Sequence, residues 1–358
     1  MSSNISSTFL LFEAILLSLL LVLAMAWVSI RLATHFKLID FPGSAPHKKH
    51  NRPTPLAGGI ALLMTLLVAE LLFGILDDWE IQAAFLAGGL IFLFGLWDDF
   101  KSISPLVKLG GQVLAAVILI RMGIFIRIFE SPEFFIRGND ALNLYLDWLL
   151  TILWVVGITN AFNFVDSMDG LAVGLGGMAA SFFMLVTLDS QQLPLSLHSA
   201  LIIGVCIGLY LFNSPPALLF LGDSGAQTLG FFLAVLGIAY SPQGANQSSS
   251  WFVPILLLGV PIFDATLVVF SRLRRKKPIY SASRDHTYHR LLNMGLEPFR
   301  AVLVMHVSAL VLGCLAFVAL NQPPLVANII FSSVLVVSVL AVIFLDRRKS
   351  WRDLAAQV

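Results

Sequence analysis

The chain has 358 residues, of which 58% are hydrophobic and only 12% are charged. Soluble domains carry about twice that charged fraction, so the composition excludes a soluble globular protein and indicates one that lies in a lipid bilayer. The formal net charge is +1, and no nucleic-acid partner is expected.

Apolar stretches long enough to cross a bilayer recur along the whole sequence, and we expect eleven transmembrane helices. Their approximate ranges are 9–32, 56–76, 81–97, 106–126, 148–164, 171–188, 198–213, 225–240, 251–271, 301–320 and 325–345. The first stretch has no preceding Lys or Arg and no cleavage site after it, so it is not expected to be a removed signal peptide. The sequence therefore predicts one all-α polytopic membrane domain over residues 1–358.

Lys and Arg gather in alternate loops. If the N-terminus lies outside the cell, the inner loops contain Lys37, Lys48, Lys49, Arg52, Lys101, Lys108, the run 272–277, Arg284, Arg290, Arg300 and the tail 346–358. The outer side keeps little more than Arg127 and Arg137. This positive-inside pattern predicts a cytoplasmic C-terminus and a location in the inner membrane. The basic tail is expected to contact anionic membrane lipids.

With this topology, the unusual polar clusters all fall on the cytoplasmic face. They span residues 40–59, 98–108, 160–170, 213–225 and 272–290. Polar clusters at the edge of the hydrocarbon are costly unless they bind something, so their convergence predicts an active site at the cytoplasmic surface.

The adjacent acids Asp98 and Asp99 end the third stretch, in GLWDDFKSISP. Neighbouring residues on a helix point about 100° apart, so the two carboxylates are not expected to hold one ion together. We expect one to face the site and the other to organise it. The alternative is a pair of solvated acids beside Lys101.

Four polar residues recur every three positions in NAFNFVDSMDGLA: Asn160, Asn163, Asp166 and Asp169. On a continuous helix this spacing keeps neighbouring members on one face, so the series is expected to line a cleft before Gly170 ends or bends the helix. A second motif, FLGDSGAQTLG, places Asp223 between two glycines, where its carboxylate can reach an ion. Ser224 is expected to cap the following helix.

Two further loops supply cations. HKKHNRPTPLAGG contains Lys48 and His50, and SRDHTYHRLL contains Asp285, His286, His289 and Arg290. The run 272–277 is assigned mostly to topology. Zinc is not favoured, because no cysteine or third suitably spaced ligand accompanies the histidines.

Clustered aspartates facing clustered cations suit a reaction between two phosphate-bearing substrates around a hard divalent ion. Mg²⁺ prefers oxygen ligands and is often held by one or two carboxylates together with substrate phosphates. There it neutralises charge during in-line displacement. Since the site lies at the bilayer boundary, one of the substrates is expected to be a lipid.

The motifs in this order resemble the polyprenyl-phosphate N-acetylhexosamine-1-phosphate transferases. The matching features are the loop 40–59 with its H-x-x-P-x-P-x-x-G-G ending, Asp98-Asp99, NAFNFVDSMDGLA, FLGDSG, PIFDA around Asp264, and Asp-His-x-x-His. The resemblance covers residues 40–292. It implies a UDP-N-acetylhexosamine donor, undecaprenyl phosphate as acceptor, UMP as leaving group, and Mg²⁺, with Mn²⁺ as a substitute.

The resemblance also implies roles for single residues. Asp223 and Asp98 would hold the metal. A catalytic role is expected for Asp98, Asp99, Asp166, Asp169, His286 and His289. Substrate binding is expected for Lys48, His50, Lys108, Asn160, Asn163, Asp264, Asp285 and Arg290. Asp98 has two candidate roles, as a general base or as an orienting group, because the acceptor phosphate is already largely dianionic at neutral pH.

PIFDA and the eleven expected crossings are similar to the branch that transfers GlcNAc-1-phosphate at the start of a cell-envelope glycan, lipopolysaccharide or teichoic acid. The peptidoglycan branch, which uses UDP-MurNAc-pentapeptide, is the alternative. Tyr288 and His47 depart from the nearer branch, and these departures concern the sugar rather than the reaction class. An ion-coupled transporter and a catalytically silent scaffold are the alternatives of another class, and a homodimer is an alternative to a monomer.

Overall fold

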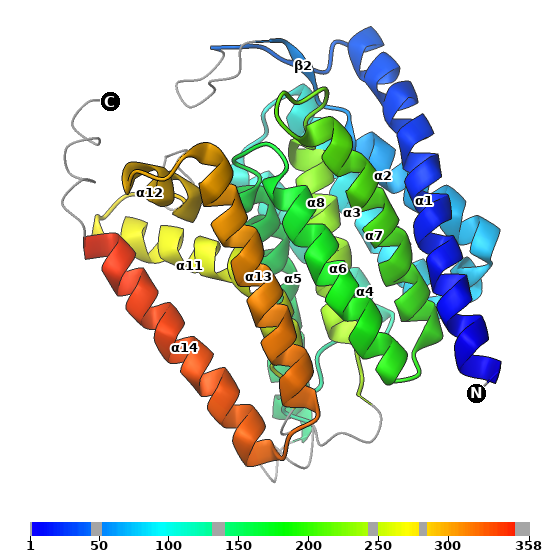
Figure 1. Cartoon of the computed structure of the whole chain (residues 1–358), viewed down its shortest axis with the longest axis vertical. Coiled ribbons are helices and arrows are strands. Elements are labelled where there is room, and N and C mark those ends of the chain that lie inside the picture. The colour runs from blue at the N-terminus through cyan, green and yellow to red at the C-terminus, as the bar shows by residue number, and fades with distance from the viewer. Residues whose placement is uncertain (1, 44–51, 131–139, 243–249, 279–284, 348–358) are drawn as a thin grey trace.

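The computed structural model describes residues 2–43, 52–130, 140–242, 250–278 and 285–347, and most of them are helical (Figure 1). The helices are α1 (Ser2–His35), α2 (Gly58–Phe73), α3 (Trp79–Phe100), α4 (Pro105–Arg121), α5 (Asp140–Val165), α6 (Leu171–Asp189), α7 (Leu193–Asn213), α8 (Gly222–Ala239), α10 (Val253–Leu257), α11 (Gly259–Arg274), α12 (Thr287–Asn293), α13 (Pro298–Leu320) and α14 (Pro324–Arg347). A 3-10 turn covers Ile75–Asp77, and β1 (Ile39–Asp40) pairs antiparallel with β2 (Thr54–Pro55).

Seven described helices are long and apolar enough to cross a membrane: α1, α3, α5, α6, α7, α13 and α14. The chain is therefore a multi-pass membrane protein. Helices also occupy the other four expected stretches, but α2 is shorter, and the ninth stretch is divided between α10 and α11 at Leu258. Eleven crossings remain a prediction.

Several helix ends follow directly from local sequence. Asp78 caps α3, because its Oδ1 accepts the N–H of Glu80 at 3.0 Å. Ser104 caps α4 ahead of Pro105, whose missing N–H costs nothing in a first helical turn. Gly74 ends α2 in the left-handed conformation, with φ of 67°. Because only four residues separate the end of α3 at Phe100 from the start of α4 at Pro105, these two helix ends lie at the same end of the bundle.

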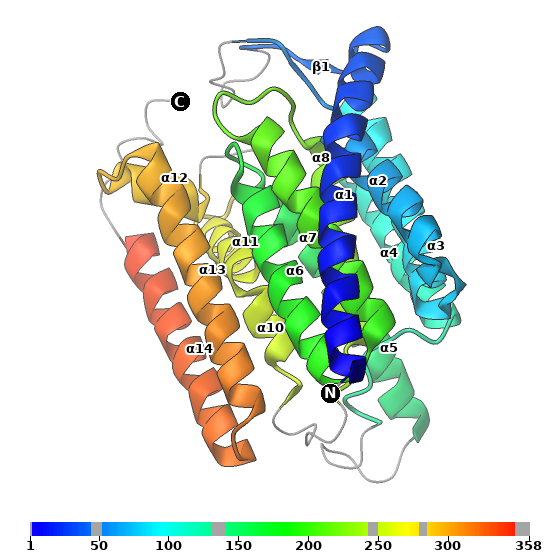
Figure 2. The ribbon, with the colours of Figure 1, turned by 45° about the vertical axis from the view of Figure 1, so that its right-hand side comes forward.

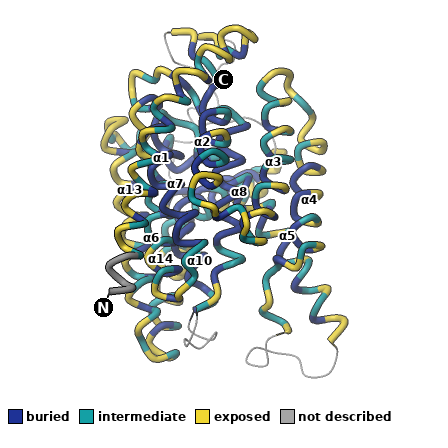
Figure 3. The backbone as a smooth tube through the Cα atoms, turned by 90° about the vertical axis from the view of Figure 1, so that its right-hand side faces the viewer, coloured by how far each residue is buried: buried dark blue, intermediate teal, exposed yellow. Residues whose placement is uncertain are grey.

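Burial separates a central set of helices from the peripheral ones. In the most apolar window of α7, 83% of the residues are buried within the protein, against 6% in α14. Figure 3 shows the buried residues in the middle of the bundle and the exposed ones on its outer faces. An apolar outer face is expected where lipid takes the place of water.

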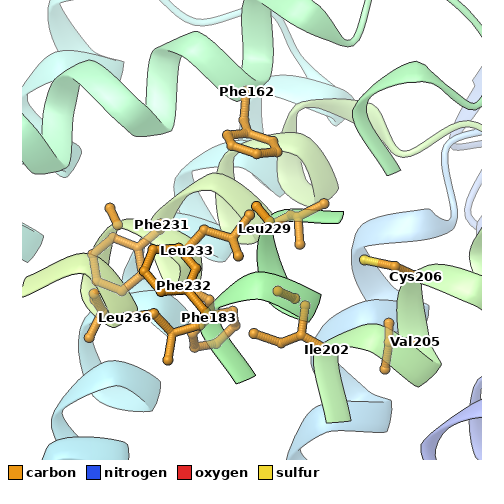
Figure 4. Close-up of a cluster of buried hydrophobic side chains, with 14 of the residues drawn as sticks. Phe162, Phe183, Ile202, Val205, Cys206, Leu229, Phe231, Phe232, Leu233 and Leu236 are labelled. Carbon is orange, nitrogen blue, oxygen red and sulfur yellow. The ribbon is translucent and has the colours of Figure 1, made fainter. Parts of the chain in front are cut away.

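The core lies where α5, α6, α7 and α8 meet (Figure 4). Phe162 of α5, Phe183 of α6 and Phe231 and Phe232 of α8 are fully buried there. Cys206 of α7 lies in the same cluster as a buried free thiol. This packing fixes α8, and α8 carries Asp223.

The β1–β2 hairpin lies at one end of the bundle, and the start of α1 lies at the other (Figures 1 and 2). Beside the hairpin, backbone hydrogen bonds join the chain before α2 to the chain before α8. Phe220 donates to the carbonyl of Pro55 at 2.9 Å and accepts the N–H of Gly58 at 3.0 Å. Figure 1 also shows α11 running across the direction of α13 and α14.

Candidate functional site

Two predicted metal ligands meet around a lysine at the hairpin end of the bundle. The Lys108 ammonium of α4 forms ion pairs with Asp98 of α3 and with Asp223 of α8. Asn163 of α5 donates from Nδ2 to Asp223 Oδ1 at 3.0 Å, and Asp98 also accepts the N–H of Ile103 at 2.8 Å. Four helices therefore bring four of the sequence-predicted site residues together.

Asp99 points away from this contact and caps another helix. Its two carboxylate oxygens accept the N–H of Asp223 at 2.7 Å, the N–H of Ser224 at 3.0 Å and the Ser224 hydroxyl at 2.6 Å. Negative charge at a helix N-terminus is favourable because the first N–H groups lack partners within the helix. The expectation that Ser224 caps α8 is wrong, because no side chain of the cap residue, Leu221, bonds to the helix and Asp99 supplies the cap instead.

Glycines allow the close approach of these elements. Gly222 has φ of +70°, and a Cβ there would lie 2.7 Å from Asp99 Oδ2. A Cβ on Gly59 would lie 2.6 Å from the backbone nitrogen of Gly225, and one on Gly95 would lie 2.6 Å from the Cα of Ser224. No role was predicted for Gly95, and its signal in the sequence is a glycine inside an apolar helix.

A layer of amides lies one helical turn deeper than the ion pair. Gln112 donates from Nε2 to Asn160 Oδ1 at 3.2 Å and to Gln227 Oε1 at 3.0 Å. Gln112 and Gln227 follow Lys108 and Asp223 by four residues, so each amide shares a helix face with a member of the pair. Substrate binding by Asn160 stays a prediction, and its described bonds fix the register of α4, α5 and α8. The missed Gln112 was visible as a polar residue within an apolar run.

Asp166 and Asp169 lie in the turn between α5 and α6. The expectation of a helix continuing to Gly170 is wrong: α5 ends at Val165, and Gly170, with φ of +77°, precedes α6. The pKa of Asp166 is raised to about 8, mainly by burial. The negative charges of Asp223, Asp169 and Asp99 raise it further. Such a concentration of carboxylates favours a bound cation.

A second buried carboxylate holds the histidine loop. Asp264 of α11 contacts His286 Nδ1 at 2.9 Å through Oδ2, and its Oδ1 accepts the N–H of Thr287 at 2.6 Å. His286 lies beside Phe164 at the end of α5, with ring centroids 6.0 Å apart. The ring centroid of His289 lies 6.4 Å from that of His286. Asp264 is fully buried, so its described contacts orient His286. Substrate binding by Asp264 stays a prediction.

Asp285 and Arg290 belong to a buried ionic network that reaches the last helix. Arg290 donates to the Ser271 hydroxyl at 2.8 Å and forms an ion pair with Asp346 at 3.4 Å. Arg275 donates to Asp285 at 2.7 Å. These contacts tie α12 to α11 and α14. The prediction that the basic tail begins at residue 346 is wrong, because α14 continues to Arg347 and Asp346 is buried within the network. Phosphate binding by Arg290 stays a prediction.

Lys48 and His50, predicted to bind phosphate, lie outside the described residues. Within the described part of the chain, no three His, Cys, Asp or Glu side chains converge closely enough to form a metal site from protein groups alone. Asp98 and Asp223 form the strongest candidate pair, because one cationic group already contacts both carboxylates.

Comparisons with known proteins show to which class this membrane bundle, with carboxylates, amides and a lysine at one end, belongs. Residues 81–241 match the glycosyl transferase family 4 model. A probable undecaprenyl-phosphate N-acetylglucosaminyl 1-phosphate transferase of Bacillus subtilis is 31% identical over 85% of this chain and 84% of its own.

Two further relatives agree. A decaprenyl-phosphate N-acetylglucosaminephosphotransferase of Mycolicibacterium smegmatis is 32% identical over 91% of this chain and 86% of its own. An undecaprenyl-phosphate alpha-N-acetylglucosaminyl 1-phosphate transferase of Escherichia coli K12 is 27% identical over 81% and 78%. The chain belongs to glycosyl transferase family 4, and it is a sugar-phosphate transferase. The family and the enzyme class predicted from the motifs are confirmed.

Proposed function

We propose that this enzyme transfers N-acetylglucosamine-1-phosphate from a UDP-sugar to undecaprenyl phosphate at the cytoplasmic face of the inner membrane. The products are UMP and a polyprenyl-diphosphate-sugar, which begins a cell-envelope glycan. The eleven crossings and the outside N-terminus belong to this proposal, which the positive-inside pattern supports. The observation that carries it is the convergence of Asp98 and Asp223 on one cation position at an end of a membrane bundle.

The donor set fits Mg²⁺. Mg²⁺ is commonly bound by one or two carboxylates, with water and phosphate oxygens completing its shell. Asp98 and Asp223, whose carboxylates both contact the Lys108 ammonium, would hold it. When bound, Mg²⁺ would neutralise negative charge on the diphosphate and on the leaving UMP.

The reaction needs one bond formed and one broken. An oxygen of the lipid phosphate attacks the phosphorus that carries the sugar, and the bond to the UMP oxygen breaks. Lys108 would then stabilise phosphate charge, and Asn163 would hold Asp223 in place. His286, oriented by Asp264, lies beside Phe164 at the end of α5 and is suited to contact a donor phosphate.

With undecaprenyl phosphate and Mg²⁺, the purified protein should release UMP from UDP-GlcNAc faster than from UDP-GalNAc or UDP-MurNAc-pentapeptide. The measurement is UMP release in detergent, with EDTA and lipid omission as controls. UMP from the pentapeptide donor alone would reassign the enzyme to peptidoglycan synthesis. No lipid-dependent UMP from any donor would refute the proposal.

Asp98→Asn should lower kcat about a hundredfold at every pH, leaving the shape of the pH profile unchanged. The acceptor's second phosphate pKa is about 6, so at neutral pH little deprotonation is needed and an orienting carboxylate suffices. The measurement is kcat from pH 6 to 9.5 for both proteins. Recovery of the variant at high pH would instead make Asp98 a general base.

A further inference from the structure

Lys108 lies where a metal ion would have to bind. Its ammonium contacts one oxygen of Asp98 and one of Asp223, Oδ2 in both residues. Its side chain is 22% exposed, so the group can leave this position without crossing the protein core. An ammonium and a divalent ion cannot occupy the same point between two carboxylates.

The surrounding contacts restrict how the two carboxylates can respond. Asp223 Oδ1 accepts from Asn163, and Asp98 Oδ1 accepts from the backbone of Ile103. The oxygens that face Lys108 are therefore those left for a cation. The backbone of Asp223 is also fixed, because its N–H donates to Asp99 at 2.7 Å. Exchange of the cation is thus a simpler change than rearrangement of the carboxylates.

Charge supplies a reason for such an exchange. Asp98, Asp99, Asp166, Asp169 and Asp223 lie near one another at this end of the bundle, and like charges held together destabilise one another unless a cation is present. Lys108 provides a cation permanently attached to the chain.

We propose that Lys108 is an internal competitor of the metal: its ammonium neutralises Asp98 and Asp223 in the free enzyme and must be displaced when a divalent cation binds. This rests on the proposed function, in which Asp98 and Asp223 hold Mg²⁺. Without nucleotide, the metal would then bind weakly because it competes with Lys108. A nucleoside diphosphate would favour metal binding in two ways. Its oxygens complete the metal's ligand shell and its negative charge accepts the displaced ammonium.

The test measures metal binding without turnover. Purified wild-type protein and Lys108→Met are titrated with Mn²⁺ in the absence of nucleotide, and the free ion is followed by electron paramagnetic resonance. The variant should bind Mn²⁺ roughly tenfold more tightly, the size expected when one charge-assisted hydrogen bond no longer competes. Adding UDP should tighten binding less in the variant than in the wild type.

Lys101→Met is the matched control. It removes the same charge from an exposed position next to α3, three residues after Asp98. Its Mn²⁺ affinity should equal that of the wild type. Equal affinity in Lys108→Met and wild type, or weaker binding in Lys108→Met, would overturn the inference. An equal gain in Mn²⁺ affinity in Lys108→Met and Lys101→Met would also overturn it, because the gain would then come from the general loss of positive charge.

A second variant protects the test against misfolding. Lys108→Gln keeps a hydrogen-bond donor and removes the charge, and Mn²⁺ should raise its unfolding temperature more than that of the wild type. No difference in this Mn²⁺-dependent rise would contradict the inference. Failure of the proposed function is seen separately, as wild-type UMP release that persists in EDTA or never occurs.

Discussion

Asp223→Asn should lower kcat for UMP release by about a thousandfold, while the protein remains folded. The substitution keeps the shape of the side chain and an oxygen for Asn163, but removes the negative charge that faces Lys108. Losing one preorganised electrostatic contact at a reacting phosphate has a cost of this size. The measurement is kcat at saturating UDP-GlcNAc and lipid, with the thermal unfolding profile recorded for each protein.

The control for this experiment is Asp189→Asn, which changes an exposed aspartate at the far end of α6. Its kcat should match that of the wild type. Asp223→Asn should also need more Mg²⁺ for half-maximal residual activity, since a carboxylate is a better ligand for Mg²⁺ than an amide. A kcat within tenfold of the wild type would remove Asp223 from the centre of the site.

Gly95→Val should have the largest effect on stability, lowering the free energy of unfolding by about 3 kcal/mol and abolishing most activity. A Cβ at this position would lie 2.6 Å from the Cα of Ser224, 2.8 Å from its nitrogen and 2.9 Å from the carbonyl oxygen of Asp223. These are backbone atoms that cannot rotate aside, so α3 or α8 must shift. The unfolding temperature in detergent and UMP release measure the two consequences.

Gly89→Val provides the comparison on the same helix. No atom lies within 4 Å of a Cβ placed there, so the variant carries the same helix propensity change without the clash. It should unfold near the wild-type temperature and keep its activity. Similar losses in both valine variants would show that helix propensity, and not the contact with α8, explains the effect.

The sequence predicted the helices well because membrane helices are visible in it as long apolar runs. It was wrong where a polar motif sat at a helix end. The three-residue spacing from Asn160 suggested one continuous helix, but α5 ends at Val165. Ser224 had the right residue type and position to cap α8, yet the cap comes from Asp99. Local patterns do not report a partner 125 residues away.

The sequence pointed to several of the side chains that meet around Lys108, but it did not indicate what each of them contacts. Asp98 and Asp99 are adjacent, and their helical angle correctly indicated different partners. Which of them faces Asp223 depends on how α3 packs against α8, and no pattern in either segment states that. Gln112 and Asp346 were not predicted to be part of these polar networks. Gln112 is a single polar residue in an apolar run and Asp346 a single acid beside a basic tail, so neither gives a periodic signal.

The cap that Asp99 provides also bears on how the enzyme is made. During synthesis α3 is made well before α8. The Asp99 carboxylate therefore cannot accept the N–H groups of Asp223 and Ser224 until α8 has also been made. This end of the molecule therefore depends on a contact between segments far apart in the chain, and the Gly-Asp-Ser-Gly turn alone does not contain all the groups that hold it.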